Sequence, residues 1–232
     1  MIPLRDDQPC FSTPFVNYFL IAVNLVVFLW ELSIGHRALN LFMVEFGVVP
    51  HHTIAVLTGH SYDPAATAIL PLITSMFLHA SFLHVAGNML FLWIFGDNVE
   101  DYLGHFGYLV FYMASGLVAS ATHILLNLNS QVPSVGASGA IAGVMGAYFI
   151  LYPRARVLIW FPPIFLFYVP AWLMLGYWFV GNLLSGTATS IAETSQTSGG
   201  IAFWAHVGGF VAGILMVKVF HERSNRYHYG TW

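Results

Sequence analysis

The chain has 232 residues, of which 58% are hydrophobic and only 7% are charged. Soluble domains carry about 25% charged residues, so this composition excludes a soluble globular protein. Seven Lys and Arg residues against ten Asp and Glu residues give a net charge of −3, which excludes the basic surface that nucleic-acid binding requires. The single cysteine excludes an internal disulfide and a Cys-x-x-Cys metal or redox motif.

Six apolar stretches have the length of helices rather than of strands. They cover residues 15–34, 82–99, 106–126, 138–152, 164–184 and 201–220. Lipid offers no water to unpaired backbone groups, and the stretches lack the alternation that is typical of barrel strands. The sequence therefore predicts an all-α polytopic membrane protein, a six-transmembrane-helix bundle that forms a single domain over residues 1–232.

The positions of Lys and Arg predict the orientation, because positively charged loops are retained in the cytoplasm. With six spans both termini lie on one side, and cytoplasmic termini place every Lys and Arg except Arg37 in the cytoplasm. Residues 1–14 lack the pattern of a signal or transit peptide, so we expect the plasma membrane of a prokaryote. Residues 35–72 then form an external loop against the membrane surface, and the small, polar residues 185–200 form a mobile external connection.

The fourth apolar stretch is too short to cross a bilayer. Ser138 lies sixteen residues before Arg154, which corresponds to about 24 Å of helix against a hydrocarbon core of about 30 Å. The preceding residues 127–137 are polar and contain Gly and Pro, and such backbone is tolerated at membrane depth only beside protein or a water-filled cavity. The sequence therefore predicts a wet pocket at Ser138 that opens to the external side.

Three more polar side chains are predicted at a similar depth. His206 lies twelve residues before Lys218, and His84 and Asn88 lie sixteen and twelve residues before Glu100. These spacings put the three side chains about 18 to 24 Å above the cytoplasmic end of their helices. Because polar side chains inside a bilayer usually face the interior of the bundle, we expect them to form one site with the serine.

Glycines four residues apart indicate that the fourth and sixth helices pack closely. The two pairs are Gly139 with Gly143, and Gly209 with Gly213. His206 precedes the second pair by three and seven residues and so shares its helix face, while Ser138 adjoins the first pair. The spacing therefore predicts a hydrogen bond between the serine hydroxyl and the imidazole.

Such a pair is suited to nucleophilic catalysis, because a neutral histidine can take the proton of a serine hydroxyl. At a helix N-terminus Ser138 also lies among unpaired N–H groups that stabilise an oxyanion. His84 and Asn88, four residues apart on one face, can donate further hydrogen bonds to that oxygen. The alternative is that they hold helices together. The set indicates acyl transfer to water without a cofactor or a metal.

These motifs resemble those of the rhomboid intramembrane serine proteases. The residues that carry the resemblance are His84-x-x-x-Asn88, Gly136-x-Ser138-Gly139 and Ala205-His206-x-x-Gly209, in this order on the second, fourth and sixth spans. It extends over about residues 46–220, between short cytoplasmic tails. It implies that Ser138 is the nucleophile, that His206 is the general base, and that His84, Asn88 and the Ser138 N–H form the oxyanion hole.

The resemblance also implies a class of substrate and the part of the chain through which the substrate enters. Family members cleave transmembrane segments of membrane-protein substrates within the lipid bilayer, and residues 170–200 resemble the gate through which substrate enters. Two positions depart from the common family pattern. Leu70-Pro71 replaces a Trp-Arg pair of the first external loop, and Ala142 replaces an aromatic residue beside the catalytic imidazole.

Other functions fit the sequence less well. A non-catalytic rhomboid-like protein that binds and escorts transmembrane helices is the main alternative, but such proteins usually lack the Ser or the His. A transporter predicts paired charges or inverted repeats in the spans, and the sequence has neither. A metalloprotease requires His-Glu-x-x-His, which is absent, and His51-His52 is expected to be a loop pair that binds no metal. His79 is expected to support the external loop.

Overall fold

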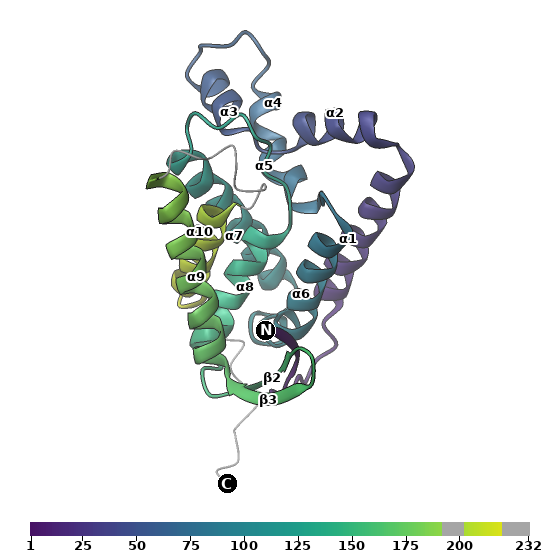
Figure 1. Cartoon of the computed structure of the whole chain (residues 1–232), viewed down its shortest axis with the longest axis vertical. Helices are drawn as coiled ribbons and strands as arrows, with labels where there is room; N and C mark the ends of the chain where they lie inside the picture. Colours follow the sequence, from purple (N-terminus) through teal and green to yellow (C-terminus); the bar gives the residue numbers. More distant parts are fainter. Residues whose placement is uncertain (192–201, 220–232) are drawn as a thin grey trace.

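The structure is a computed structural model of the chain that describes residues 1–191 and 202–219. This part of the chain is mostly helical, with one small sheet (Figure 1). The helices are α1 (Phe15–Ser33), α2 (His36–Phe46), α3 (Pro50–Leu57), α4 (Ala66–Ile69), α5 (Pro71–Thr74), the 3-10 turn η1 (Ser75–Phe77), α6 (Phe82–Leu103), α7 (His105–Leu126), α8 (Ser138–Leu151), α9 (Ala171–Ile191) and α10 (Phe203–Val217). The strands are β1 (Ile2–Asp6), β2 (Arg156–Phe161) and β3 (Phe165–Pro170).

Helix α8 is the centre of the bundle. It packs on α6, α7, α9 and α10, while α1 packs on α6 and α7 at the periphery. The consecutive residues Gly139–Tyr148 are all buried, so neighbouring helices cover every side of α8 over this length. As the short fourth stretch predicts, α8 has only 14 residues, which corresponds to about 21 Å.

Two described helices, α1 and α7, are long and apolar enough to cross a bilayer alone. A third span results if α6 is counted together with residues 66–77, which meet it at a bend of 76°. Helices α8 and α10 are apolar but shorter. Each of the six expected stretches overlaps one helix, namely α1, α6, α7, α8, α9 or α10. Length and composition, however, support two or three complete spans among the described residues rather than six.

The prediction of an all-α fold is wrong at one end of the bundle, where β1, β2 and β3 form an antiparallel sheet. The fifth apolar stretch was expected to be helical from residue 164, but it begins as β3, and α9 starts only at Ala171. Pro162 and Pro163 interrupt any helix here, and the aromatic and β-branched residues on both sides favour paired strands. Apolar content alone does not separate a hairpin strand from a helix.

The N-terminal residues, which were expected to be a tail, form β1 of this sheet. Asp7, directly after β1, accepts hydrogen bonds from the backbone N and the Nε of Arg156 at 2.6 and 2.8 Å. Asp6 accepts a hydrogen bond from the hydroxyl of Tyr148 on α8. These contacts attach the start of the chain to the central helix and to the hairpin.

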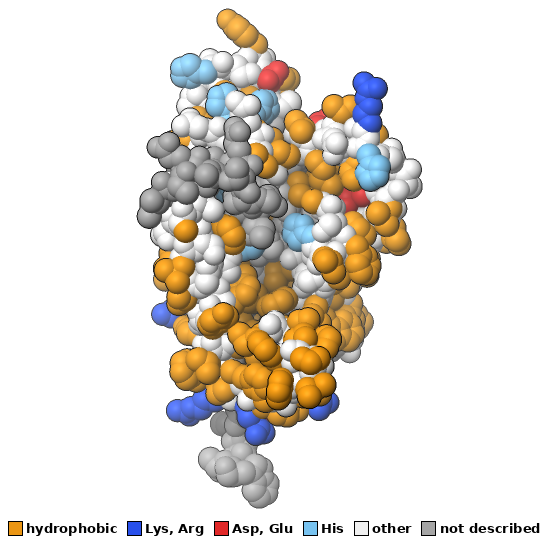
Figure 2. All heavy atoms as spheres, in the orientation of Figure 1, with side chains coloured by type: hydrophobic (Ala, Val, Ile, Leu, Met, Phe, Trp, Pro, Cys, Tyr) orange, Lys and Arg blue, Asp and Glu red, His pale blue; other side chains and the backbone are white. Residues whose placement is uncertain are grey.

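The basic side chains are concentrated at the sheet end. Arg5 and Arg156 lie in the sheet, and Arg154 lies just before it. Arg37 lies in α2, which is at the opposite end together with α3 and α4 (Figure 1). In Figure 2 most blue side chains surround the lower end of the molecule, as the expected orientation requires. The expected mobile connection lies outside the described residues from residue 192 to its end, as do Arg223 and Arg226, whereas residues 185–191 belong to α9.

Candidate active site

Ser138 and His206 are in direct contact. Ser138 is the first residue of α8, His206 lies in the first turn of α10, and the distance from Oγ to Nε2 is 2.8 Å. The contact depends on the close approach of the two helices. A Cβ atom on Gly209 would collide with the backbone oxygen of Gly139, and one on Gly213 would collide with that of Gly143.

The other ring nitrogen of His206 is bound by a residue that the sequence analysis missed. The Nδ1 atom lies 2.6 Å from Oδ1 of Asn182 on α9. The amide Nδ2 of Asn182 donates to the backbone oxygen of Trp178 at 2.8 Å, which turns Oδ1 toward the imidazole. Because an amide oxygen only accepts, Nδ1 carries the proton and Nε2 is free to accept one from Ser138.

Trp178 also contacts the imidazole directly. Its ring centroid lies 5.5 Å from that of His206, with an angle of 35° between the planes. The sequence predicts no aromatic residue beside the imidazole, because Ala142 stands at the position expected from the family pattern. In this structure the aromatic ring comes from α9 instead, and Ala142 is buried within reach of Gly209.

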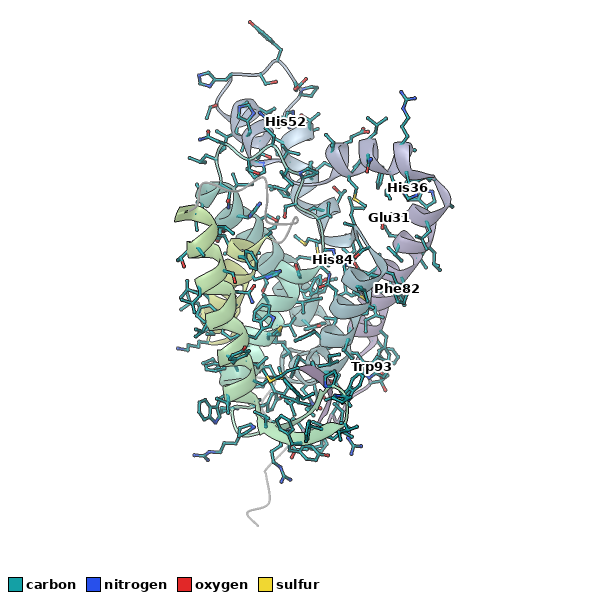
Figure 3. The ribbon with its side chains drawn as sticks, viewed as in Figure 1. Glu31, His36, His52, Phe82, His84 and Trp93 are labelled. Atoms are coloured by element: carbon teal, nitrogen blue, oxygen red, sulfur yellow. The ribbon has the colours of Figure 1, made fainter. Side chains whose placement is uncertain are left out.

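His84 and Asn88 lie together on α6, next to the segment that precedes Ser138. Gly136 has a φ of 128°, which favours glycine, and a Cβ there would lie 2.7 Å from Cε1 and Nε2 of His84 and 3.6 Å from Nδ2 of Asn88. Gly136 therefore lets the backbone run directly against these side chains. Figure 3 shows His84 near the middle of the molecule.

His79 was expected to support the external loop, but it also contacts residues of two helices. Its Nε2 lies 2.8 Å from Nδ2 of Asn88, and its ring centroid lies 5.1 Å from that of His84. Its backbone N donates to the buried carboxylate of Glu31 on α1, at 3.2 and 3.3 Å. His79 therefore connects α1 to the His84 and Asn88 pair, a link that its position in the sequence does not indicate.

One open cavity of about 510 Å³ brings all four expected site residues together. Its polar wall includes Ser138, His206, His84 and Asn88, and its other lining residues are mostly apolar, Trp178 among them. In Figure 2 the front of the molecule is hollowed between its left and right halves. The cavity therefore offers space beside the serine hydroxyl for a chain that is largely apolar.

The remaining candidates lie away from this cavity. His52 of α3 bonds Asp63, in the exposed segment between α3 and α4, at 3.1 Å. Leu70-Pro71 joins α4 to α5. Within residues 1–191 and 202–219, no three His, Cys, Asp or Glu side chains are grouped closely enough to hold a metal ion.

Comparison with known proteins identifies relatives over most of the chain. The family model of the Rhomboid domain matches residues 66–223. Rhomboid protein 1, mitochondrial, of Saccharomyces cerevisiae is 32% identical over 203 residues, which are 85% of this chain and 51% of that protein. The human presenilin-associated rhomboid-like protein, mitochondrial, is 28% identical over 197 residues, 81% of this chain and 48% of that protein. Rhomboid protease GluP of Bacillus subtilis is 33% identical over 135 residues, 58% of this chain and 24% of that protein.

These relatives differ from the chain in length, and their names indicate different membranes. The chain spans about half the length of the first two relatives. Both are named as mitochondrial proteins, which differs from the expected plasma membrane of a prokaryote, whereas the third is bacterial. The match of the Rhomboid domain model to more than half of the chain shows the family: the chain belongs to the rhomboid family of integral membrane proteins.

Proposed function

We propose that this chain is an intramembrane serine endopeptidase that hydrolyses peptide bonds in or near transmembrane segments of membrane-protein substrates. The observation that supports it most strongly is the 2.8 Å contact between Ser138 Oγ and His206 Nε2 in an open cavity. We place the rhomboid core at about residues 46–220 of one membrane domain. The site opens to the external side, because the basic residues gather at the sheet end.

The first step is attack by the serine. Ser138 Oγ bonds to the carbonyl carbon of the scissile peptide while His206 Nε2 takes the hydroxyl proton. Asn182 holds the opposite ring nitrogen, so the tautomer and the ring orientation are fixed before substrate arrives. The imidazolium then gives its proton to the leaving amine, and a covalent acyl-enzyme remains.

The oxyanion that forms in this step requires donors. His84, one N–H of Asn88 and the backbone N–H of Ser138 are the proposed set, and the start of α8 adds the positive end of a helix dipole. The contact with His79 occupies one hydrogen of the Asn88 amide and leaves the second for the substrate oxygen. Water then attacks the acyl-enzyme, with His206 again taking a proton, and restores the serine.

The test is cleavage of a synthetic single-span polypeptide with a helix-destabilised segment by the purified chain in liposomes. We expect the unsubstituted protein to cleave it, and Ser138→Ala and His206→Ala to be inactive at equal thermal stability. Cleavage by Ser138→Ala contradicts the assigned nucleophile. Binding of several such polypeptides without cleavage by any form supports the alternative, a non-catalytic protein that binds and escorts transmembrane helices.

A further inference from the structure

One face of the small sheet is left open by the described helices. In β2, Val157 and Ile159 are buried and belong to the core of the bundle. Successive side chains of a strand point to opposite faces, so Arg156 and Trp160 lie on the other side, where both are exposed. We call this other side of the sheet the outward face.

The pairing of the strands extends the outward face over β1 and β3. Trp160 pairs with Ile2 of β1 and, through an adjacent position, with Leu166 of β3. These three side chains are 37%, 38% and 59% exposed, and we call them the apolar row. Two residues further along the strands, the next row contains Arg5 and Tyr168. The outward face therefore has an apolar row beside a basic one.

The basic row carries a positive charge that the sheet does not neutralise. Both of its arginines contact Tyr168: Nη2 of Arg5 donates to the hydroxyl at 3.2 Å, and the guanidinium carbon of Arg156 lies 5.6 Å from the ring centroid. Asp7 forms an ion pair with Arg156, but among the described residues no carboxylate lies within ion-pair distance of Arg5. A neutral hydroxyl thus positions the Arg5 guanidinium and leaves its charge for an anion outside the chain.

The edge of β3 indicates the level at which the sheet lies in the membrane. The strand order is β1-β2-β3, so no described strand pairs with the outer edge of β3, and open edges of this kind do not occur in the hydrocarbon core. Residues 165–168 are nevertheless apolar or aromatic and all exposed. The headgroup region meets both requirements, because it offers water to the backbone and acyl chains to the side chains. Figure 2 shows a mass of apolar side chains below the hollow, with basic side chains along its lower border.

We propose that the outward face binds an acidic phospholipid of the leaflet at the sheet end. The guanidinium groups of Arg5 and Arg156 bind the headgroup phosphate, which arginine contacts through paired hydrogen bonds, and the apolar row lies against the adjoining acyl chains. A second copy laid on the same face would bring arginine against arginine, whereas an acidic lipid supplies the opposite charge. No residue of the two rows lines the cavity at Ser138, so this binding is separate from proteolysis.

The first test measures which lipid lies beside the outward face. A bimane fluorophore is attached to Leu166→Cys in a Cys10→Ser background, and the chain is reconstituted in phosphatidylcholine vesicles with equal mole fractions of brominated phosphatidylglycerol or brominated phosphatidylcholine. We expect the acidic lipid to quench the fluorophore more strongly, and Arg5→Gln to reduce this preference about fivefold, because one basic group at the membrane surface is lost. Arg37→Gln is the matched control, since Arg37 is exposed on α2 at the opposite end of the molecule.

Three outcomes of this test overturn the proposal. The first is equal quenching by the two brominated lipids, and the second is a preference for the acidic lipid that Arg5→Gln leaves unchanged. The third is a fluorophore that neither lipid quenches, together with disulfide formation between Leu166→Cys chains, because a second copy then covers the face.

The second test uses the purified chain without a label. Native mass spectrometry in detergent with added phosphatidylglycerol compares the unsubstituted protein with Arg5→Gln, Arg5→Lys and Arg37→Gln, after thermal unfolding has shown equal stability. We expect Arg5→Gln to lose a phosphatidylglycerol molecule that the other three forms retain, because only this change removes a charge from the outward face. The same retention is expected of Ser138→Ala, so the result stands whether or not the chain is a protease. Equal retention of the lipid by Arg5→Gln and the unsubstituted protein overturns the proposal.

Discussion

At His206, side chains from two other helices bind the two ring nitrogens of one imidazole. Ser138 on α8 binds Nε2, and Asn182 on α9 binds Nδ1. The Asn182 side chain is only 9% exposed, and its own N–H is held by the backbone of Trp178, so the amide has one favourable orientation. The position of α9 therefore determines which ring nitrogen of His206 carries the proton.

We expect Asn182→Ala to lower kcat/KM by about tenfold to a hundredfold, because the imidazole loses the group that fixes its tautomer. Asn182→Asp keeps an acceptor for Nδ1–H and is expected to recover part of the loss. Thr187→Ala is the control on the same helix, since within the part of the chain that the structure describes the Thr187 hydroxyl bonds to the backbone of α9. A KM effect without a kcat effect, or equal losses in Asn182→Ala and Thr187→Ala, contradicts this role.

Most of the site could be predicted from spacing, but Asn182 could not. The depth of a residue follows from its spacing only where a charged residue marks the cytoplasmic end of its helix, as Lys218 does for α10 and Glu100 for α6. The fifth stretch has no charged residue between Arg156 and Glu193, so nothing in it marks depth. A polar amide within this apolar stretch was the available signal.

At the scale of elements, the crossing of α8 and α10 brings Ser138 and His206 together. The two helices run in the same direction, and their backbones touch at Gly139 with Gly209 and at Gly143 with Gly213. Small residues at such contacts replace side-chain packing with backbone contact. A Cβ added at Gly209 or Gly213 therefore pushes the helices of Ser138 and His206 apart.

We expect Gly213→Ala to destabilise the protein by about 2 kcal/mol and to reduce cleavage, because the new methyl group meets the backbone oxygen of Gly143. Gly181→Ala on α9 is the control, since a Cβ there has no neighbour within 4 Å. Unfolding in mixed detergent and the cleavage assay measure the two effects. Equal stability of the two variants contradicts the close contact.

The contact between Asp7 and Arg156 predicts a pH dependence. Partial burial raises the pKa of Asp7, but the hydrogen bonds and the charge of Arg156 outweigh this and hold the pKa below its usual value of 3.8. A lowered folded-state pKa adds stability above the unfolded value, and this stability is lost as the pH falls through the folded value. The two side chains are 35% and 67% exposed, so we expect about 0.5 kcal/mol or less.

The measurement compares the unsubstituted protein with Asp7→Asn. We expect the unsubstituted protein to be the more stable at pH 7, with a difference that disappears between about pH 4 and pH 2. Thermal unfolding across this range and hydrogen exchange of the β1 amides follow the change. A difference that grows as the pH falls contradicts the assigned contact.

The sheet shows what apolar patterning alone cannot predict. Residues 164–170 are as apolar as a transmembrane helix, and they form β3 because Pro162 and Pro163 reverse the chain and β2 offers backbone partners. Strand β1 comes from the start of the chain, more than 140 residues from β2. Pairing across such a separation leaves no local signal in the sequence.

At the scale of the whole molecule, the distribution of charge divides the protein into two ends. The sheet end carries Arg5, Arg154 and Arg156, and the opposite end carries α2, α3 and α4 with Arg37. This distribution follows the rule that basic residues stay on the cytoplasmic side. The common level of the polar residues could be argued from sequence because it depends on helix rise. The six expected spans could not, since length and composition support two or three complete spans among the described helices, and the arrangement around α8 depends on side-chain packing.

We expect thiols introduced at the two ends of the protein to be labelled from opposite sides of the membrane. In a Cys10→Ser background, Tyr62→Cys places a thiol at a fully exposed position between α3 and α4, and Ile164→Cys places one at a 77% exposed position in the turn of the hairpin. A membrane-impermeant maleimide should label the first in intact cells and the second only after permeabilisation. Labelling of both thiols in intact cells contradicts the orientation.

The complete burial of α8 has a consequence for how the protein responds to its bilayer. Neighbouring helices cover Gly139–Tyr148 on all sides, whereas α1 exposes Phe19, Val26 and Leu29 on its outer surface. Acyl chains of different length therefore act on α1 and the other outer helices, which adjust by tilting. The helix that carries Ser138 has almost no contact with these chains, so the protein, rather than the thickness of the surrounding lipid, determines the depth of Ser138 in the membrane.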